Sequence, residues 1–425
     1  MKVEQALQLI PPLEALTPLR FLLLANARGD DRVVWEGSGA YRTVGKRDVQ
    51  TRELRRQIGA MLQQVARDRS DCYEAYADAL DCIEEGSGAG AVEHLLRAGR
   101  VVEASSLLEQ ARAWYVVALD VARAIPSRQP EVEALLALGK VNMRLGRFEE
   151  AGRHFQRGLT LAESELDKVA AADACVGLGN VALELAPGPN GAMAWYNRGL
   201  SHARAAGDER RIGELHLELG EASCRTGEWS LAGDNLRDAR ELFDDLEDPR
   251  GIARVLALQA ELSAGVGDTR EAAAAYRAAL ARVVQEVSDP ALEVSIRIDY
   301  AKVLLETGNY LETEAELRRA EQLAIANNLI QELVRIYTLL GSAHGRQGDE
   351  VGFVFFEQAI ELMRMLDHSQ LDEAQVCFEY GVFESRVERP EESRAYLERA
   401  KRIFESIGSS GGVERVEAEL HRVSA

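Results

Sequence analysis

Few residues in this chain of 425 have the types and spacing that could bind a metal or activate a nucleophile. Its seven histidines include no HxxxH or HExxH pair, the spacing that places two zinc ligands on one face of a helix. Its cysteines are odd in number and scattered, with no CxxC pair and no framework for disulfides: Cys72, Cys82, Cys175, Cys224 and Cys377. We therefore expect no metal, no cofactor and no catalytic centre, and a reducing, cytoplasmic location.

Two glycine-rich stretches resemble phosphate-binding loops, but neither has the required pattern. In GAYRTVGKR, residues 39–47, five residues separate the glycines and Arg47 follows the lysine, whereas a phosphate loop needs four residues and then Ser or Thr. GSGAG, residues 86–90, follows a predicted helix rather than a strand, so it indicates a turn. The carboxylate pair Glu149 and Glu150 falls in a predicted first helical turn, where acidic side chains stabilise the helix dipole. None of these features indicates an enzyme.

The composition favours a helical protein. Hydrophobic residues make up 46% of the chain and aromatic residues 6%, with ten prolines, which together argue against a β-sandwich. Fifty basic and seventy acidic residues give a net charge of −20, which disfavours direct nucleic-acid binding. RFLLLANA, residues 20–27, is too short and wrongly flanked for a signal peptide, and no apolar run approaches the roughly 20 residues that span a bilayer. We expect no membrane insertion, and the preference for Arg over Lys suggests a high-GC bacterium.

A period of about 40 residues runs through most of the chain. The pattern of an aromatic residue or Leu, two residues, and then Ala or Gly occurs nine times, at spacings of 39 to 41 residues. Its small residues are Ala79, Ala118, Gly158, Gly199, Ala239, Ala279, Ala320, Ala359 and Ala400. A second series lies about 19 residues upstream of each: Gly59, Gly99, Gly139, Gly179, Gly220, Ala260, Ala301, Gly341 and Gly381. Turn residues separate the two series: Gly146, Gly188, Gly227, Gly267, Gly308 and Gly348.

These series predict pairs of antiparallel helices. A small residue on one helix lets the partner helix approach closely, while a large side chain three or four residues from a small one fills the adjoining hole. Helices of about 16 residues are marginal alone in water, so neighbouring pairs must stack to bury their apolar faces. The fold class predicted is therefore all-α, an α-solenoid of about nine helical hairpins.

The repeat also resembles a known family. LLALGKV, residues 135–141, followed by EEAGRHFQRGL, residues 149–159, is similar to the signature of the tetratricopeptide repeat. The period near 40 residues resembles the longer-helix repeats of Pins/LGN-like proteins, kinesin light chains and bacterial regulators, as does LFDDLEDPRGIARVLALQAEL, residues 242–262. The resemblance implies a right-handed superhelix whose first helices line a concave groove. Two repeats carry Ala in place of the first-helix Gly, at Ala260 and Ala301, and are expected to be distorted.

The two ends differ from the repeats. Residues 1–48 contain predicted helices broken by prolines and, in RVVWEGSGAYRTV, a possible small hairpin, and they could cap the repeats or bind a partner. Nine repeats are expected over residues 49–411, and residues 412–425 are expected to form a C-terminal capping helix. Either cap could also support a homo-oligomer.

The resemblance further implies which residues line the groove, namely those just before and after the first-helix Gly. In order along the chain they are Arg56, Gln57, Gln63, Gln64, Arg97, Arg100, Lys140, Arg144, Asn180, Glu184, Glu218, Glu221, Arg225, Glu261, Asp299, Lys302, Glu306, Arg346, Glu379 and Arg386. Asn180 occupies the position where related repeats hold a peptide backbone. These positions predict a basic lining in the first three repeats and a mostly acidic lining in the next four.

This charge pattern suggests a bound peptide or protein. Screening limits charge interactions to about 8 Å in physiological salt, so a bound segment would feel the local pattern. An acidic segment would lie at the second and third repeats and a basic one near the fifth to seventh. The alternative is an ordinary solvated surface with ion pairs inside the chain, each contributing about 0 to 1 kcal/mol.

Two functions remain. The first is a non-catalytic scaffold or adaptor that binds another protein or a peptide in the groove. The second is a module that senses a ligand or peptide and whose output domain lies on another chain, since 48 nonrepeat residues are too few for a convincing helix-turn-helix.

Overall fold

The computed structural model describes residues 33–35, 41–43, 78–79, 82, 87–104, 108–185, 189–327, 329–365 and 370–424. The first predicted repeat, with Arg56, Gln57, Gln63 and Gln64, lies outside these residues. Strand β1 (Val33–Trp35) pairs antiparallel with β2 (Tyr41–Thr43), within the stretch for which the sequence predicts a hairpin. Val34 is opposite Arg42 in this register.

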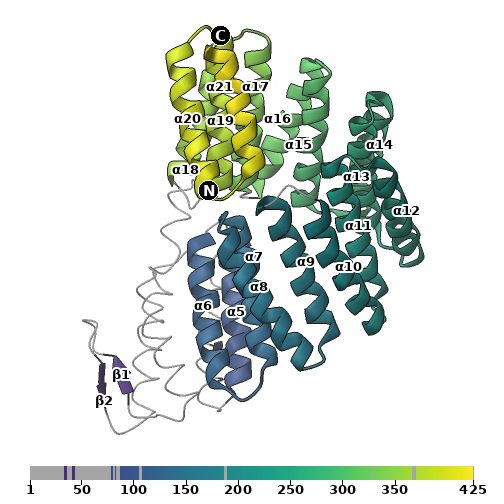
Figure 1. The fold of residues 1–425 in the computed structure, drawn as a ribbon, viewed down its shortest axis with the longest axis vertical. Coiled ribbons are helices and arrows are strands. Elements are labelled where there is room, and N and C mark those ends of the chain that lie inside the picture. The colour runs from purple at the N-terminus through teal and green to yellow at the C-terminus, as the bar shows by residue number, and fades with distance from the viewer. Residues whose placement is uncertain are drawn as a thin grey trace. The chain divides into compact units, whose positions relative to one another are not determined.

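From residue 88 onward the described chain consists of helices joined by short turns (Figure 1). The helices are α5 (Gly88–Ala104), α6 (Leu108–Ala124), α7 (Gln129–Arg144), α8 (Phe148–Ser164), α9 (Lys168–Leu185), α10 (Pro189–Ala206), α11 (Glu209–Thr226), α12 (Trp229–Asp245), α13 (Pro249–Gly265), α14 (Thr269–Arg282), α15 (Pro290–Glu306), α16 (Tyr310–Ala326), α17 (Ile330–Arg346), α18 (Gly352–Met365), α19 (Gln370–Arg386), α20 (Pro390–Ser406) and α21 (Ser410–Ser424). They form eight successive hairpins in the described residues, from α5–α6 to α19–α20, followed by α21. The prediction of an all-α helical-repeat fold is confirmed.

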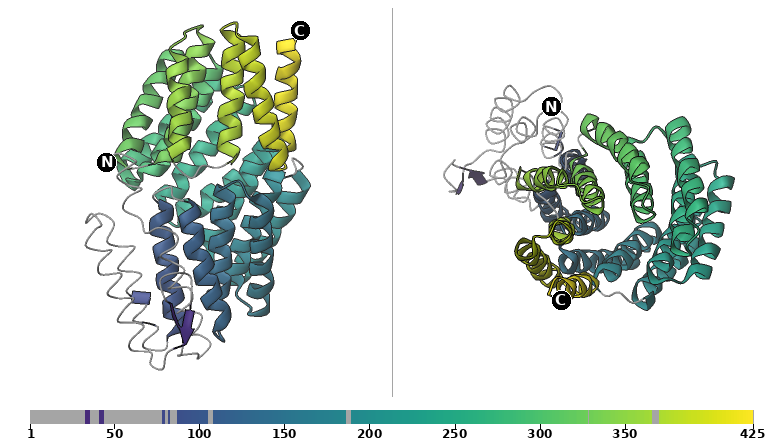
Figure 2. Two further views of the ribbon diagram at one scale, coloured as in Figure 1. Left: turned by 90° about the vertical axis from the view of Figure 1, so that its left-hand side faces the viewer. Right: turned by 90° about the horizontal axis from the view of Figure 1, so that it is seen from above.

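The chain divides into two compact units, which we treat separately. Helices α5 to α8 belong to the first unit, and α10 to α21 with most of α9 belong to the second. Within the second unit the hairpins follow one another in chain order, as the two views of Figure 2 show. Each helix packs mainly on the other helix of its hairpin, and less extensively on the next hairpin. No helix in the described residues is both long and apolar enough to cross a membrane.

The two predicted series of small residues are close contacts between paired helices. At Gly139 of α7, an added Cβ would lie 2.4 Å from the ring of Phe155 on α8, closer than real Cβ atoms approach other atoms. The same contact recurs in other hairpins of each unit: Tyr115 with Gly99, Tyr196 with Gly179, Leu236 with Gly220, Phe356 with Gly341 and Leu397 with Gly381. The large residue of the second helix thus occupies the space that the glycine leaves, as the sequence predicts.

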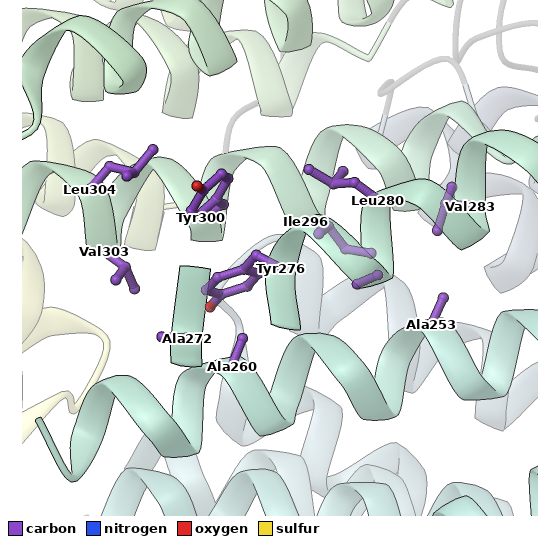
Figure 3. Packing of buried hydrophobic residues seen from close by; sticks show 11 residues of the cluster. Ala253, Ala260, Ala272, Tyr276, Leu280, Val283, Ile296, Tyr300, Val303 and Leu304 are labelled. Atoms are coloured by element: carbon purple, nitrogen blue, oxygen red, sulfur yellow. The ribbon is translucent and has the colours of Figure 1, made fainter. Parts of the chain in front are cut away.

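Where the first helix carries Ala, the large partner still packs. Ala260 and Tyr276 are buried in one cluster, and Ala301 and Leu317 in another. Figure 3 shows Tyr276 near Tyr300, with Ala260 and Ala272 on its other side, and the two tyrosine rings lie 5.4 Å apart between centroids. The sequence predicts distortion in both of these repeats. In the first, α14 runs into a π-helical turn (Val283–Val287), whereas α15 and α16 of the second are regular α-helices.

Turns and helix ends follow the local sequence. Gly227 ends α11 in the left-handed region, with φ of 76°, which glycine adopts without steric cost. Four more of the predicted turn glycines have positive φ, and Gly188 lies outside the described residues: Gly146, Gly267, Gly308 and Gly348. Aspartates cap several helices by accepting backbone N–H groups, as Asp208 does from Arg211 at the start of α11.

The last helix, α21, packs against α20 and α19. Its Val416 is fully buried, and Gly412 lies against the ring of Phe404, so the helix covers the end of the last hairpin. Lys401 Nζ of α20 donates to Glu417 Oε1 of α21 at 2.6 Å. The sequence predicts a helix at residues 412–425, and the observed helix begins two residues earlier.

Candidate partner-binding surface

Within each unit, several first helices of successive hairpins contact one another. In the first unit α5 contacts α7, and in the second unit α11 contacts α13, α15 contacts α17, and α17 contacts α19. The second helices of successive hairpins make few such contacts in the described part of the chain. We call the first helices of a unit its first-helix layer.

The predicted groove residues all lie on first helices, where the structure describes them. They are Arg97 and Arg100 on α5, Lys140 and Arg144 on α7, Asn180 and Glu184 on α9, Glu218, Glu221 and Arg225 on α11, Glu261 on α13, Asp299, Lys302 and Glu306 on α15, Arg346 on α17, and Glu379 and Arg386 on α19. Each is exposed or half-buried. Arg56 is outside the described residues. These side chains are therefore available to solvent on their own unit.

Several of these side chains bind the preceding first helix. Near the C-terminus of α11, Arg225 Nη1 lies 2.9 Å from Glu184 Oε1 of α9. Arg144 Nη1 makes the equivalent ion pair with Glu103 Oε1 of α5 in the first unit, at 3.1 Å. Arg346 Nη1 instead donates to the backbone oxygen of Leu305 on α15, at 3.0 Å. Sequence reasoning missed this recurring link, although the arginines recur at multiples of about 40 residues.

The part of the layer formed by α9 to α15 is acidic. Burial, followed by the nearby Glu221, raises the pKa of Glu218 to about 7. Partial desolvation by the neighbouring helices also raises the pKa of Glu261 to about 7, with added repulsion from Glu221 and Asp299. Cations on these helices offset only part of this charge, as where Arg254 Nη2 lies 3.5 Å from Glu218 Oε1. The acidic residues predicted to line the fourth to seventh repeats lie on these helices, and their role as a groove lining stays a prediction.

Asn180 of α9 is held from behind by the second helix of its hairpin. The buried Tyr196 of α10 donates its hydroxyl to Asn180 Oδ1 at 2.5 Å. Burial and the nearby carboxylate of Glu218 raise the pKa of Tyr196, so its hydroxyl stays protonated and remains a donor. The ring reaches this position because it packs against Gly179. With its oxygen bonded to Tyr196, the half-buried amide of Asn180 has its NH2 group left to donate.

A cavity of about 550 Å³ opens on the first-helix layer of the second unit. Its lining comes from four helices: Lys302, Leu305 and Glu306 of α15; Val334, Arg335, Thr338, Leu339 and Arg346 of α17; Leu371, Asp372, Gln375, Val376 and Glu379 of α19; and Arg415 of α21. Its volume lies within the range of ligand-binding pockets. We call it the α17 pocket. Lys302, Glu306, Arg346 and Glu379 were predicted groove residues, whereas Arg415 was not.

A smaller cavity of about 360 Å³ lies near the N-termini of α11 and α13. Its arginines are paired within the second unit: Arg210 with Asp248 at 3.0 Å, Arg250 with Asp289 at 3.0 Å, and Arg254 with Glu218 at 3.5 Å. These pairs join successive hairpins, so a structural role accounts for the charges of this cavity.

The described histidine and carboxylate side chains that could in principle bind a metal or transfer a proton instead make structural contacts. His344 Nδ1 lies 2.8 Å from Asp349 Oδ2 across a turn, and His216 Nδ1 lies 3.0 Å from Asn235 Oδ1 between α11 and α12. Glu149 and Glu150 lie in the first turn of α8. No group of three or more His, Cys, Asp or Glu side chains able to hold a metal occurs in the described residues.

Comparisons with known proteins agree with this architecture. The sequence profile of the tetratricopeptide repeat matches residues 132–165, which span most of α7 and all of α8. The chain carries a tetratricopeptide repeat. A search of curated proteins found no match.

Solved structures of helical repeat proteins share the fold. The crystal structure of a Rap protein complexed with competence and sporulation factor is 13% identical, with a TM-score of 0.52, covering 97% of this chain and 98% of that one. The Rap conjugation gene regulator of plasmid pLS20, in complex with the Phr* peptide, is 14% identical, with a TM-score of 0.52, covering 81% of this chain and 95% of that one. At such low identity these likenesses show the fold alone.

Proposed function

We propose that this tetratricopeptide repeat chain is a non-catalytic scaffold or adaptor that binds a segment of another protein against its first-helix layer. The observation that carries this proposal is the α17 pocket, which combines an apolar floor with charged groups on four helices. A floor of this kind supplies affinity and the surrounding charges supply orientation. The Rap structures that share the fold were solved with a peptide or a factor bound, which is compatible with this role.

A regulatory module is the second candidate. The pLS20 protein of similar fold is a conjugation gene regulator that was solved with a peptide. A peptide-sensing function whose output lies on another chain is therefore our second proposal. The two candidates share the binding surface. They differ in whether binding changes the capture of a further protein.

Photo-crosslinking from the pocket tests the proposal. A photoreactive amino acid replaces Leu339, which lines the pocket, and in a matched variant it replaces Leu231, which is 40% exposed on the second helix α12. Each variant is expressed at its natural level in the source organism, irradiated and analysed by mass spectrometry. We expect crosslinks to one protein partner from position 339 only. Equal crosslinking from both positions, or none from position 339, would reject the pocket as the binding region.

The charge of the pocket offers a second test. Arg346 and Arg386 occupy the same position on successive first helices and are both exposed, but only Arg346 lines the pocket. We expect Arg346→Glu to abolish the crosslink from position 339, while Arg386→Glu leaves it unchanged.

A further inference from the structure

Some charged groups of the α17 pocket are already neutralised within the chain. Lys302 Nζ lies 2.8 Å from Asp299 Oδ1, and Arg335 Nε lies 3.8 Å from Asp372 Oδ1. These pairs leave two cations and two anions of the lining with no ion pair in the described residues: Arg346, Arg415, Glu306 and Glu379.

Three of these four groups have neutral hydrogen-bond partners that hold them in place, and Arg346 uses the backbone oxygen of Leu305. Arg415 Nη2 donates to Gln375 Oε1 at 3.1 Å, and its guanidinium lies 5.4 Å from the ring centroid of Phe378. Glu379 accepts from Ser342 Oγ and Gln375 Nε2, both at 3.0 Å. Neutral contacts order a charge without cancelling it, so each group retains its attraction for an opposite charge.

The lining therefore matches a ligand that carries both signs of charge. A polyanion would meet the carboxylates of Glu306 and Glu379, and a polycation would meet Arg346 and Arg415. Like charges placed together at short range are destabilising, so either uniform ligand is disfavoured.

The size of the pocket fits a short extended segment. Arg346 lies eleven residues beyond Arg335 on α17, which is about 16 Å along the helix axis at about 1.5 Å per residue. An extended chain rises about 3.3 Å per residue, so about five residues span this distance. Aliphatic side chains that are almost fully buried also line the pocket: Leu305 and Val334 are 4% and 5% exposed, and Val376 is 2% exposed.

We propose that the α17 pocket binds an extended segment of about five residues from a protein partner, in which an acidic and a basic side chain flank aliphatic residues. Each end of the pocket has one cation and one anion: Arg346 bonds the backbone oxygen of Leu305, next to Glu306, whereas Arg415 and Glu379 both bond Gln375. The acidic side chain therefore pairs with the arginine at one end, and the basic side chain pairs with the carboxylate at the other end. This inference rests on the proposed function and adds the chemistry of the partner. It also assigns Arg415, from the C-terminal helix, a role in specificity.

Peptide binding to the full chain tests the inference. Three fluorescein-labelled peptides carry the cores Glu-Leu-Val-Ala-Lys, Glu-Leu-Val-Ala-Glu and Lys-Leu-Val-Ala-Lys between identical Gly-Ser spacers. Fluorescence anisotropy at physiological salt should give the mixed core at least about tenfold tighter binding than either uniform core, the ratio that a difference of about 1.4 kcal/mol produces. Because the chain has a net charge of −20, nonspecific attraction would favour the core with two lysines instead.

Charge variants distinguish a specific pocket from general attraction. We expect the double variant Arg346→Glu with Arg415→Glu to weaken binding of the mixed core about tenfold and to strengthen binding of the core with two lysines. Arg386→Glu, a control outside the pocket, should change neither affinity by more than about twofold. Arg346→Gln and Arg415→Gln, with circular dichroism of every variant, ensure that the effect does not come from unfolding.

Equal affinities for the three cores, or a ranking that follows peptide charge alone and does not change in the double variant, would overturn this inference. Crosslinking from position 339 would still support the proposed function in that case. Loss of the crosslink would reject both.

Discussion

Phe155 of α8 occupies the space that Gly139 of α7 leaves open, with ring atoms 2.4 to 2.7 Å from where a Cβ would stand. This contact fixes the distance between the two helices of its hairpin, because even one methyl group would force the ring or the backbone to move. A residue without a side chain is thus required at a position where a helix would otherwise favour Ala.

We expect Gly139→Ala to lower the free energy of unfolding by about 2 kcal/mol, the usual cost of overpacking a core. Gly158→Ala is the matched control in the same hairpin. An added Cβ there would lie 3.4 Å from Leu136, an ordinary contact, so the higher helix propensity of Ala should leave stability unchanged or raise it by up to about 1 kcal/mol. Urea unfolding followed by circular dichroism compares them. Equal effects of the two substitutions would contradict the packing argument.

Glu131 is a second structural centre of the first unit. Its carboxylate is fully buried and lies 2.7 Å from Arg157, 3.1 Å from Arg128 and 3.4 Å from Arg123. We expect Glu131→Ala to destabilise the chain by about 2 kcal/mol. This is less than the loss of a fully buried pair, because the arginines are 40% to 53% exposed and can rehydrate.

The neighbouring Glu133→Ala is the control for Glu131, since Glu133 is exposed on the same helix. Its unfolding midpoint should match that of the unmodified chain. Similar midpoints for Glu131→Ala and Glu133→Ala would show that the ion pairs of Glu131 with the three arginines do not stabilise the fold.

The acidic part of the first-helix layer should make stability depend on pH. Burial raises the pKa of Glu218 and of Glu261 to about 7 in the folded chain, from an ordinary value of 4.5. The folded state therefore binds more protons than the unfolded state between about pH 4.5 and pH 7, and stability falls as pH rises through this window. We expect a lower thermal unfolding midpoint at pH 8 than at pH 6.

Glu218→Gln and Glu261→Gln should each reduce this pH dependence, because glutamine cannot ionise. Glu241→Gln, on an exposed site of α12, should leave it intact. Thermal unfolding midpoints of each variant, measured at half-unit pH steps, give the pH dependence. An unchanged slope in both Glu218→Gln and Glu261→Gln would show that burial of these two carboxyl groups does not cause the pH dependence.

The contact between Tyr196 and Asn180 can be tested from both sides. Asn180→Ala leaves the buried hydroxyl of Tyr196 without its partner, which should cost about 1 to 2 kcal/mol. Combining it with Tyr196→Phe should recover part of this loss, since both partners are then removed. Asn197→Ala, exposed on α10, is the control with little expected effect. Strict additivity of the two substitutions in urea unfolding would argue against the contact.

The sequence predicts the hairpins well because their packing follows a local rule. A small residue must face a large one, and the two series of Gly or Ala and of aromatic residues or Leu state this rule directly. The same register places the predicted groove residues on first helices. The sequence therefore determines which helix each residue occupies and which side of the hairpin it belongs to.

The links between hairpins are harder to predict. Arg225 pairs with Glu184, but Arg346, at the equivalent position, donates to a backbone oxygen, because the residue opposite differs from repeat to repeat. The raised pKa of Glu261 depends on burial among residues of α11 and α15 that are distant in sequence. The sequence does not predict the position of Arg415 at the pocket, because the last helix lies outside the repeat pattern. The distance of 40 residues between Arg415 and Gln375 was the available signal.

Arg415 lies on α21, outside the eight described hairpins. One wall of the α17 pocket therefore comes from a helix that has no partner helix of its own. Any change that loosens α21 from α20, such as loss of the contact between Lys401 and Glu417, would alter binding at the α17 pocket without touching a hairpin.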